Sequence, residues 1–423
     1  MPEEYFFIQG GKKLKGEIEV SGAKNSAVSA ITASLLTDKP CLIKNLPHVE
    51  DVLVLLKLIE KLGAKVELGK NEVKIQAKSL DFKKLDSSLI PKLRSSILLL
   101  PSFLQKLKEF EMPEPGGCLI GARPLDAHFD VIKAFGGEVF YTKGKTFLVK
   151  VKKLRGGEVI LPEFSVTATE NALMIASFLS RPTQIKIAAL EPQIQDLVSI
   201  LRKMGAKIRY GPFHQIFVEG KRRLNGFEHT LISDPIEAGT YFILAGMTKS
   251  CFKVKKAKRE YLELVIKKLE DFGIRFKVEK DGIFVDGTSS LRSPGKIQVM
   301  PYPGIPTDLQ CNFGVLATQA KGMTLIHDPL YEGRLKYLEE INQMGGKVIF
   351  CDPHRALIFG PTLLFGKKIQ SYDIRSGGAL LLAALAAKGE SIISNVYHID
   401  RGYEKIDLKL QALGAKIYRQ KIK

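Results

Sequence analysis

The stretch LGAKV, at residues 62–66, returns in variant form five more times along the 423-residue chain. Every copy carries glycine in its second position and follows a segment with apolar residues at helical spacing. The glycines are separated by 73, 69, 68, 72 and 69 residues, and they are Gly63, Gly136, Gly205, Gly273, Gly345 and Gly414. A near-constant step of this length indicates an internal repeat. It predicts a chain built from six copies of one structural unit.

Each unit combines two kinds of helix with strands. The segment before each glycine has one apolar stripe, which is typical of a surface helix, and the glycine fits the C-terminal end of that helix. The residues after the glycine are β-branched or aromatic, which predicts a strand. Upstream of each surface helix, a second segment is apolar nearly all round and is therefore expected to be a buried helix, for example at residues 27–36, 95–104 and 377–387. One unit is predicted to contain a buried helix, a strand, a surface helix and two further strands.

Units of this kind cannot bury an apolar face alone, so several must pack around their buried helices. Six units divide most simply into three and three, with residues 225–235 as the best candidate crossing. A continuous solenoid is the alternative, but solenoid repeats are usually shorter and need dedicated caps. Two lobes would leave a cleft, and small ligands preferentially bind in clefts between domains.

The composition limits the kinds of binding partner and the cellular compartment that can be predicted. The chain has 64 Lys and Arg against 45 Asp and Glu, a net charge of +19, which favours anionic partners without choosing among phosphates, nucleotides, nucleic acid and lipid headgroups. The five cysteines show no short spacing, which argues against a zinc site or a disulfide framework. The N-terminus does not resemble a secretory signal, and no apolar run reaches the length of a membrane span. We therefore predict a cytoplasmic protein.

A glycine-rich segment with a cysteine at its centre is the first candidate site. Residues 114–128 read EPGGCLIGARPLDAH, and their prolines and glycines predict a loop that could cover a cleft. Cys118 would then face a ligand, and the nearby Arg123 would favour a thiolate or an anionic substrate. The alternative is an inert loop thiol, because most cysteines are not catalytic.

Helix starts supply the other candidates. Lys24 and Asn25 follow Ser21, a possible N-cap, at the start of a buried helix, where backbone N–H groups attract anions. Asp308 is expected in the first turn of another buried helix, either to accept a proton from a substrate hydroxyl or simply to interact with the helix dipole. Arg94 is expected at the head of a third helix. The structural alternative for Lys24 is a solvated side chain.

Asp400, Arg401 and Glu404 precede a surface helix, and their structural alternative is a local salt-bridge cluster. Lys24, Arg94, Arg123 and Arg401 together place four cations at the starts of elements. Several fixed cations suit a small, highly charged substrate.

Four motifs give the sequence a family resemblance: SGAKN at 21–25, PGGCLIGARPLDAH at 115–128, PTD at 306–308 and YHIDRGYEKI at 397–406. The chain resembles the UDP-N-acetylglucosamine 1-carboxyvinyltransferase family, within the EPSP synthase superfamily, from about residue 5 to residue 420. The resemblance implies an α/β fold, a two-lobed inside-out α/β barrel with six repeats of about 70 residues arranged three per lobe. It places residues 22–231 in the first lobe and residues 1–21 with 232–423 in the second, because the N-terminal strand of the family crosses to complete that lobe.

The resemblance also implies an activity, namely transfer of the enolpyruvyl group of phosphoenolpyruvate to the 3-hydroxyl of UDP-N-acetylglucosamine, with release of phosphate. No metal, organic cofactor, nucleic acid or membrane is implied as a partner. Cys118 matches a proton donor that forms a covalent adduct, and Asp308 matches the residue against the attacking hydroxyl. The residues that match phosphoenolpyruvate contacts are Lys24, Asn25, Arg123 and Arg401, and Asn25 also matches a contact with the amino sugar. The residues that match nucleotide-sugar contacts are Arg94, Arg123, Pro124, Leu125, Asp126, Ala127, Asp308 and Leu330, with Asp373 as an additional acid near the reacting centre.

Three positions depart from the pattern of the family. Glu163 replaces a common lysine, Pro235 a frequent arginine and Gly333 a common asparagine, which puts substrate affinity and interlobe contacts in doubt but not the reaction class. The nearest rival is 5-enolpyruvylshikimate-3-phosphate synthase, a sister family that lacks the loop cysteine. A nucleic-acid-binding protein would suit the charge, but no basic run is interleaved with aromatic residues and the chain has no Trp.

Overall fold

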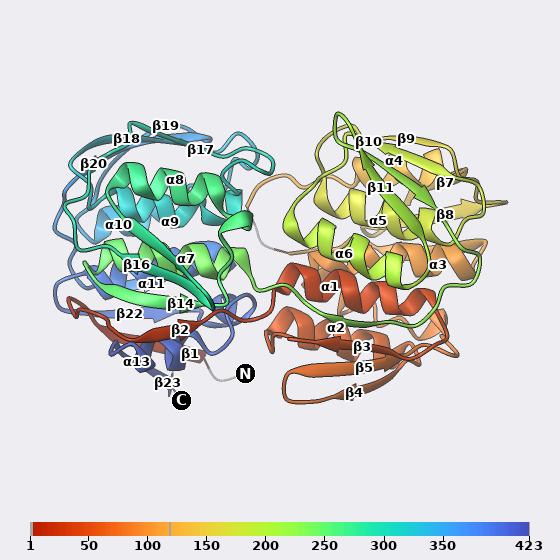
Figure 1. Ribbon diagram of the computed structural model, residues 1–423, viewed down its shortest axis with the longest axis horizontal. Coiled ribbons are helices and arrows are strands. Elements are labelled where there is room, and N and C mark those ends of the chain that lie inside the picture. The colour runs from red at the N-terminus through yellow and green to blue at the C-terminus, as the bar shows by residue number, and fades with distance from the viewer. Residues whose placement is uncertain (1–2, 118–119, 423) are drawn as a thin grey trace. The chain divides into compact units, whose positions relative to one another are not determined.

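The computed structural model describes residues 3–117 and 120–422, and within them it shows a mixed α/β protein with six separate β-sheets (Figure 1). The chain divides into two compact units. Unit 1 comprises Met1–Ser21, Cys118–Ala122 and Ser233–Lys423, and unit 2 comprises Gly22–Gly117 and Arg123–Ile232. The chain passes from unit 2 to the long C-terminal part of unit 1 between Ile232 and Ser233. This boundary lies within residues 225–235, the predicted crossing.

Unit 1 alternates strands with helices along most of its length. Its helices are α7 (Pro235–Met247), η5 (Arg259–Tyr261), α8 (Glu263–Phe272), α9 (Thr307–Ala317), α10 (Tyr337–Gln343), α11 (Ile374–Ala386), α12 (Tyr397–Asp400) and α13 (Ile406–Ala412). Its strands are β1 (Glu3–Gln9), β2 (Glu17–Glu19), β14 (Cys251–Lys255), β15 (Arg275–Glu279), β16 (Gly282–Asp286), β17 (Lys296–Gln298), β18 (Gly322–His327), β19 (Lys347–Asp352), β20 (Arg355–Gly360), β21 (Lys368–Gln370), β22 (Glu390–Ser394) and β23 (Lys416–Ile422). Their sheets have the orders β21-β22-β1-β23, β15-β16-β14-β2 and β17-β18-β20-β19.

Unit 2 follows the same alternation. Its helices are α1 (Lys24–Ala33), η1 (Ser34–Leu36), α2 (Glu50–Lys61), η2 (Phe82–Lys84), η3 (Ile90–Lys92), η4 (Arg94–Leu99), α3 (Leu100–Lys106), α4 (Asp126–Ala134), α5 (Val166–Ser177) and α6 (Pro192–Lys203). Its strands are β3 (Cys41–Lys44), β4 (Lys65–Leu68), β5 (Glu72–Gln76), β6 (Glu109–Pro113), β7 (Gly137–Thr142), β8 (Thr146–Val151), β9 (Glu158–Ile160), β10 (Thr183–Lys186), β11 (Lys207–Gly211), β12 (Gln215–Glu219) and β13 (Glu228–Thr230). Their sheets have the orders β13-β3-β5-β4, β11-β12-β10-β9 and β6-β8-β7.

The prediction of a barrel is wrong for the described residues, because none of the six sheets closes on itself. Each sheet has three or four strands, and that is too few for closure. The N-terminal strand β1 is nevertheless a central strand of unit 1, because it pairs antiparallel with both β22 and β23. Phe6 lies opposite Ile393 on one side and Arg419 on the other.

The helix-ending role of the six repeated glycines is confirmed. All six have φ between +91° and +106°, the left-handed region that closes a helix without the steric cost of a Cβ. At the end of α2 the Gly63 N–H donates to the Glu60 carbonyl at 2.9 Å, and the Ala64 N–H donates to the Ile59 carbonyl at 3.1 Å. The following strand can therefore start at once in a new direction.

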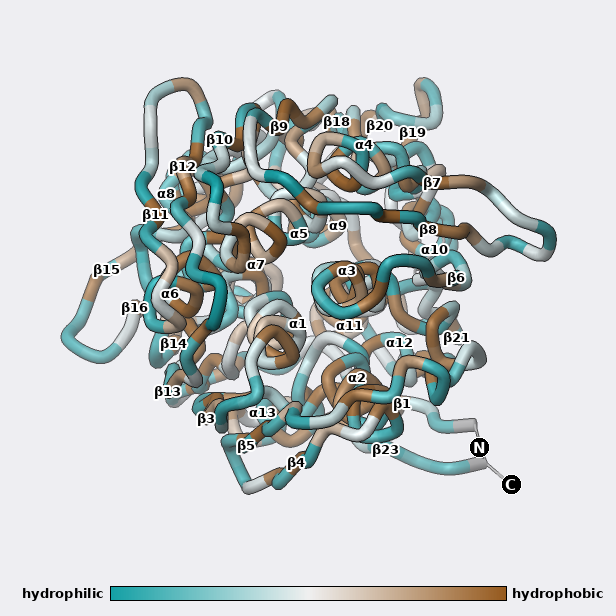
Figure 2. Tube along the Cα trace, turned by 90° about the vertical axis from the view of Figure 1, so that its right-hand side faces the viewer, coloured by the Kyte–Doolittle hydropathy of each residue, from teal (hydrophilic) through white to brown (hydrophobic). Residues whose placement is uncertain are grey.

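The buried helices form the interior of each unit. In unit 1, α7, α9 and α11 contact one another, and in unit 2, α1 contacts α6 and η4 while α5 contacts α3, α4 and α6. Every residue of α7 from Ile236 to Met247 is buried. A Cβ on Gly314 of α9 would lie 1.8 Å from the Tyr337 hydroxyl oxygen, so this glycine permits the close packing of α10. In Figure 2 the brown stretches lie mainly in helices and the teal stretches mainly in loops and outer strands.

Two local expectations need correction. The buried helix expected at 95–104 is a 3₁₀ helix, η4, followed by the short α3, because Pro101 fits only the first turn of an α-helix. Three-residue strands also precede the buried helices: β9, β13, β17 and β21 each pair in parallel with a later or earlier strand. Three residues are too few for an alternating pattern to be read.

Gly414→Ala tests the glycine argument at a position with open space. The φ of Gly414 is +94° and a Cβ would meet no atom within 4 Å, so the substitution adds backbone strain alone. We expect a loss of about 1 kcal/mol in the free energy of unfolding, measured by urea titration with circular dichroism. Gly157→Ala is the control, because Gly157 has the same open space without a left-handed φ. Equal stability of both variants would contradict the argument.

Candidate active site

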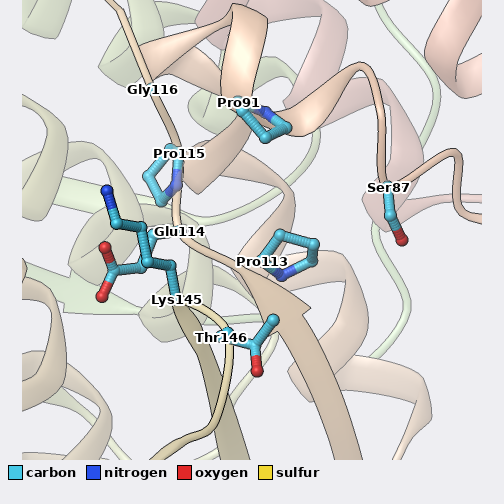
Figure 3. A pocket seen from close by; sticks show the side chains of 9 residues that line it. Ser87, Pro91, Pro113, Glu114, Pro115, Gly116, Lys145 and Thr146 are labelled. Carbon is cyan, nitrogen blue, oxygen red and sulfur yellow. The ribbon is translucent and has the colours of Figure 1, made fainter.

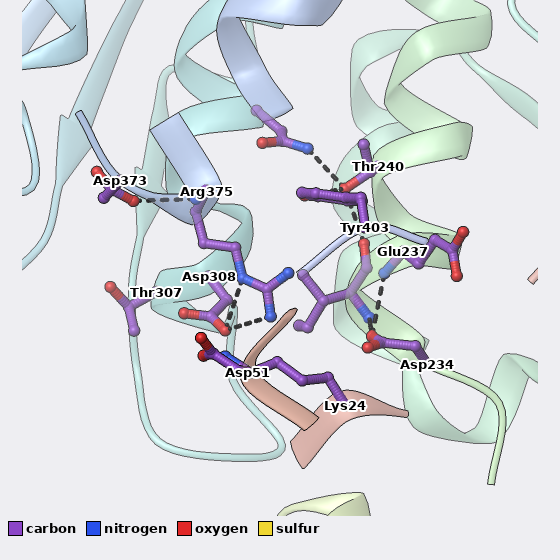
Figure 4. Close-up of polar contacts among 12 residues, drawn as sticks. Lys24, Asp51, Asp234, Glu237, Thr240, Thr307, Asp308, Asp373, Arg375 and Tyr403 are labelled. Atoms are coloured by element: carbon purple, nitrogen blue, oxygen red, sulfur yellow. Dashed lines mark hydrogen bonds and ion pairs between the residues drawn. The ribbon is translucent and has the colours of Figure 1, made fainter. Parts of the chain in front are cut away.

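Asp308 lies in the first turn of α9, as predicted, and two arginines of unit 1, Arg334 and Arg375, hold its carboxylate. Figure 4 shows the contact with Arg375. The Arg334 Nη2 donates to Asp308 Oδ1 at 3.0 Å. On the other oxygen, Oδ2, Arg375 donates from Nε at 3.0 Å and from Nη2 at 2.9 Å. Two nitrogens of Arg375 therefore meet one carboxylate oxygen while Arg334 donates to the other, so both oxygens of Asp308 have charged donors.

The two arginines beside Asp308 are buried, and nearby acidic groups keep them charged. The Arg334 and Arg375 side chains are only 4% and 5% exposed. Burial is the largest single effect and would lower the pKa of each guanidinium, but the neighbouring acidic groups, Asp308 first among them, together outweigh it and raise the pKa of both arginines. Both arginines therefore stay charged, and the cluster presents a carboxylate between two fixed cations.

Further polar groups support this cluster. Asp373 is the N-cap of α11, where it accepts backbone N–H groups from Arg375 at 2.9 Å and Ser376 at 3.2 Å. It also lies 3.5 Å from Arg334 Nη1. Thr307 accepts from Arg334 Nε at 3.2 Å and donates to Asp328 at 2.6 Å. The additional acid predicted at Asp373 is therefore part of the same network as Asp308.

Lys24 is the first residue of α1 in unit 2, followed by Asn25. The Lys24 Nζ lies 2.6 Å from Asp51 Oδ2 at the start of α2, so Lys24 is paired with a carboxylate and is not a simple solvated side chain. The N-cap of α1 is Ala23, so the N-cap prediction for Ser21 is wrong. The Ser21 hydroxyl instead bonds to Glu404 and Lys409 in unit 1.

The stretch expected to bind the nucleotide sugar runs from Arg123 into α4. Pro124 is exposed, Leu125 and Ala127 are buried, and Asp126 is the first residue of the helix. Arg94 begins η4, and its Nη2 donates to the Pro124 carbonyl at 3.1 Å. Within unit 2, the structure therefore brings Arg94 together with the 123–127 stretch.

Cys118 and Leu119 lie outside the described residues, so the position of the predicted proton donor is not part of this geometry. The residues that follow contact the 332–333 turn. The Gly333 N–H donates to the Ile120 carbonyl at 2.9 Å, and the Ala122 N–H donates to Glu332 Oε1 at 2.7 Å.

The departure at Gly333 has a local steric explanation. A Cβ there would lie 2.8 Å from the Ile120 carbonyl carbon, so this close approach of two backbones requires glycine. The hydrogen bond from Ala122 also lowers the pKa of Glu332.

The remaining predicted residues lie at the surface or at element ends. Arg401 is buried and follows directly after α12. Leu330 is 45% exposed, and its N–H donates to Asp328 at 3.0 Å. Pro235 occupies the first turn of α7, a position that proline favours. Glu163 is exposed in the loop before α5.

The two acids beside Arg401 contact residues in other segments of unit 1. Asp400 binds Arg419 of β23 through two contacts of 2.7 Å. Glu404 accepts from the Ser21 hydroxyl at 3.0 Å. Both acids therefore bind residues far away in the sequence.

A pocket of about 590 Å³ lies in unit 2 at the base of the glycine-rich segment (Figure 3). Its lining includes Pro91, Pro113, Pro115 and Lys145. It contains none of the predicted substrate residues, so we do not assign it to the site.

A buried acid occupies the middle of unit 2. Glu170 of α5 is 2% exposed, and burial together with the charge of Glu191 raises its pKa to about 8, against the opposing hydrogen bond from Ser29. Glu170 is therefore mostly protonated at neutral pH.

The sequence analysis did not predict a role for Arg334 or Arg375. Arg334 directly follows Gly333, and Arg375 lies two residues after Asp373. A single arginine gives no periodic signal. The only sequence signal for either arginine was its closeness to a residue already of interest, Gly333 or Asp373.

The described parts of the chain contain no group of three or more His, Cys, Asp or Glu side chains able to hold a metal ion. Within the same residues, no helix is long and apolar enough to cross a membrane.

Two solved structures share this fold. The enolpyruvyl transferase NikO from Streptomyces tendae matches with a TM-score of 0.90 at 24% identity, covering 100% of both chains. An EPSP synthase from Acinetobacter baumannii matches with a TM-score of 0.75 at 18% identity, covering 98% of this chain and 99% of the other. The fold is thus that of the EPSP synthase-like enolpyruvyl transferases.

Sequence comparison gives the family. A family model described as EPSP synthase (3-phosphoshikimate 1-carboxyvinyltransferase) matches residues 8–410. A relative from Halothermothrix orenii, named UDP-N-acetylglucosamine 1-carboxyvinyltransferase, is 42% identical and covers 98% of this chain and 99% of its own length. A relative of the same name from Treponema denticola is 38% identical, covering 97% of this chain and 98% of its own. The chain belongs to the EPSP synthase family, and the resemblance to transferases of this name is confirmed.

Glu170→Gln tests the buried acid. The folded protein holds a proton on Glu170 between the ordinary pKa of 4.5 and about 8, whereas the unfolded chain does not. Stability therefore falls as pH rises through this window, by about 1.4 kcal/mol per pH unit from this residue. We expect Glu170→Gln to remove that slope in urea titrations at pH values within the window. The exposed Glu219→Gln should leave the slope unchanged, and an unchanged slope in both variants would refute the assignment.

Proposed function

We propose that the protein transfers the enolpyruvyl group of phosphoenolpyruvate to the 3-hydroxyl of UDP-N-acetylglucosamine and releases phosphate, the first committed step of peptidoglycan synthesis. The observation that carries the proposal is the Asp308 carboxylate at the start of α9, held by Arg334 and Arg375. The family resemblance assigns this position to the residue against the attacking hydroxyl. Full-length similarity to relatives of that name supports the same substrates.

The anionic substrates account for the candidate cations. We assign Lys24, Asn25, Arg123 and Arg401 to phosphoenolpyruvate, and Arg94 with residues 123–127 and Leu330 to the nucleotide sugar. Lys24 and Arg123 belong to unit 2, whereas Asp308 and Arg401 belong to unit 1.

The proposed chemistry needs three proton transfers between protein and substrates, the formation of one carbon–oxygen bond and the cleavage of another. The Cys118 thiol donates a proton to C3 of phosphoenolpyruvate, and positive charge develops at C2. The sugar oxygen forms a bond to C2 while its proton passes to the Asp308 carboxylate. The bond from C2 to the phosphate oxygen then breaks, and phosphate leaves with a proton that balances the one taken up by Asp308, which returns to its ionised form. The methyl group loses a proton to the thiolate, which restores the double bond.

The arginines give Asp308 a fixed orientation for this step. Because Arg334 and Arg375 are buried and charged, they hold the carboxylate without waiting for solvent to reorganise. They also stabilise the acid in its ionised form before the hydroxyl proton arrives. Asp373 restrains Arg334 from its other side.

We also propose the six-repeat architecture, with three repeats in each of two lobes. It is supported by the six sheets and by the six left-handed glycines at their constant spacing. In this description β1 supplies a missing strand of the last repeat.

Phosphate release tests the substrate assignment. The protein is incubated with phosphoenolpyruvate and either UDP-N-acetylglucosamine or shikimate 3-phosphate, the acceptor of the sister family. We expect release only with UDP-N-acetylglucosamine. Release only with shikimate 3-phosphate would favour 3-phosphoshikimate 1-carboxyvinyltransferase activity over our proposal.

Asp308→Asn tests the proton acceptor. We expect the transfer rate to fall by about 10²- to 10⁴-fold, because the amide cannot take the hydroxyl proton. Asp352→Asn is the matched control, since this half-buried acid contacts Arg355 and the His354 N–H, both close to it in the sequence, and should leave the rate unchanged. Circular dichroism monitors folding of both variants, and a normal rate in a folded Asp308→Asn would return Asp308 to a structural role.

A further inference from the structure

A buried histidine joins two segments of unit 2. His128, the third residue of α4, is 2% exposed. Its Nδ1 lies 2.9 Å from Asn171 Nδ2, and its Nε2 lies 3.1 Å from Thr167 Oγ1. Asn171 and Thr167 both belong to α5. We call these three residues the His128 network.

The contacts define the tautomer of His128. The Asn171 Nδ2 also donates to the Ile97 carbonyl at 3.2 Å, so both contacts place the amide nitrogen, a donor, at this position. The Nδ1 of His128 must then accept the hydrogen bond from Asn171. The Nε2 therefore carries the proton and donates to the Thr167 hydroxyl.

The surroundings of His128 keep it neutral. Burial lowers its pKa to about 3, and the charges of Arg94 and Arg123 add to that effect. A second ring proton would also remove the acceptor that Asn171 needs. The network is thus a fixed neutral link beside two of the cations proposed to bind substrate.

The His128 network connects α4, which includes the end of the 123–127 stretch proposed to bind the nucleotide sugar, with α5. On α4, the His128 N–H donates to the Leu125 carbonyl at 2.9 Å, directly after the 123–127 stretch. On α5, Thr167 follows Ser165, the N-cap residue that accepts from the Ala168 N–H.

We propose that His128 is a positioning residue, which acts through the 123–127 stretch and the start of α5 to set the affinity for the nucleotide part of the sugar substrate. This inference rests on the proposed function. His128 touches no substrate in this account. Loss of the network should therefore weaken nucleotide binding while the apparent affinity for phosphoenolpyruvate stays the same.

Three variants separate this role from ordinary packing. Thr167→Val keeps the shape of the side chain but removes the hydroxyl that accepts from His128 Nε2. His128→Asn introduces a side chain too short to contact Thr167. His128→Gln places a donor near the position of Nε2 and should rescue binding. Thr183→Val is the matched control, because the buried Thr183 hydroxyl makes no hydrogen bond.

Calorimetry with UDP as the probe measures the effect, and steady-state kinetics gives KM for both substrates. We expect Thr167→Val and His128→Asn to raise the Kd for UDP and the KM for UDP-N-acetylglucosamine about tenfold, the cost of one lost hydrogen bond. The KM for phosphoenolpyruvate should stay within about twofold, and His128→Gln should bind within about threefold of the unmodified protein. Equal UDP affinity in Thr167→Val, His128→Asn and the unmodified protein would overturn the role of His128.

Nitrogen-15 NMR of the histidines supplies a second readout. At about pH 5.5, where an ordinary histidine is charged, His128 should remain neutral with its proton on Nε2. A charged ring at that pH would overturn the network. Unmodified protein that binds neither UDP nor UDP-N-acetylglucosamine would instead overturn the proposed function, and the positioning role with it.

Discussion

The carboxylate of Asp308 holds three separate segments of unit 1 together. Arg334 comes from the 331–334 turn and Arg375 from the start of α11, and both guanidiniums are almost fully buried. Burying two cations is costly unless an ionised partner offsets the desolvation. The arrangement of these three segments therefore depends on the negative charge of Asp308. The proposed proton transfer requires the same charge.

The buried helices explain how charged groups are held in each unit. Asp308 and Asp373 in unit 1, and Lys24 in unit 2, lie at the N-terminal ends of helices whose remaining length is almost wholly buried. The buried part fixes the helix, and the N-terminal end presents the charged group. Each of these helices thus holds its charged group on a fixed backbone.

The periodic features of the fold could be predicted from the sequence, and the non-periodic ones could not. The repeated glycines and the position of Asp308 were readable, because helix ends and apolar stripes are local signals. Arg375 was missed because its partner lies 67 residues away. Ser21 was misread as an N-cap because Glu237, a residue distant in sequence, accepts its N–H at 2.7 Å. Which strands pair in which of the six sheets could not be predicted, because strand pairing depends on contacts between segments distant in the sequence.

The fate of the bridging oxygen of phosphoenolpyruvate tests the central claim most directly. Substrate labelled with ¹⁸O between C2 and phosphorus is turned over with UDP-N-acetylglucosamine, and phosphorus NMR follows the label. Enolpyruvyl transfer breaks the C2–O bond, so the account predicts that the released phosphate carries the heavy oxygen. Heavy oxygen retained in the organic product would mean phosphorus–oxygen cleavage and would contradict the account.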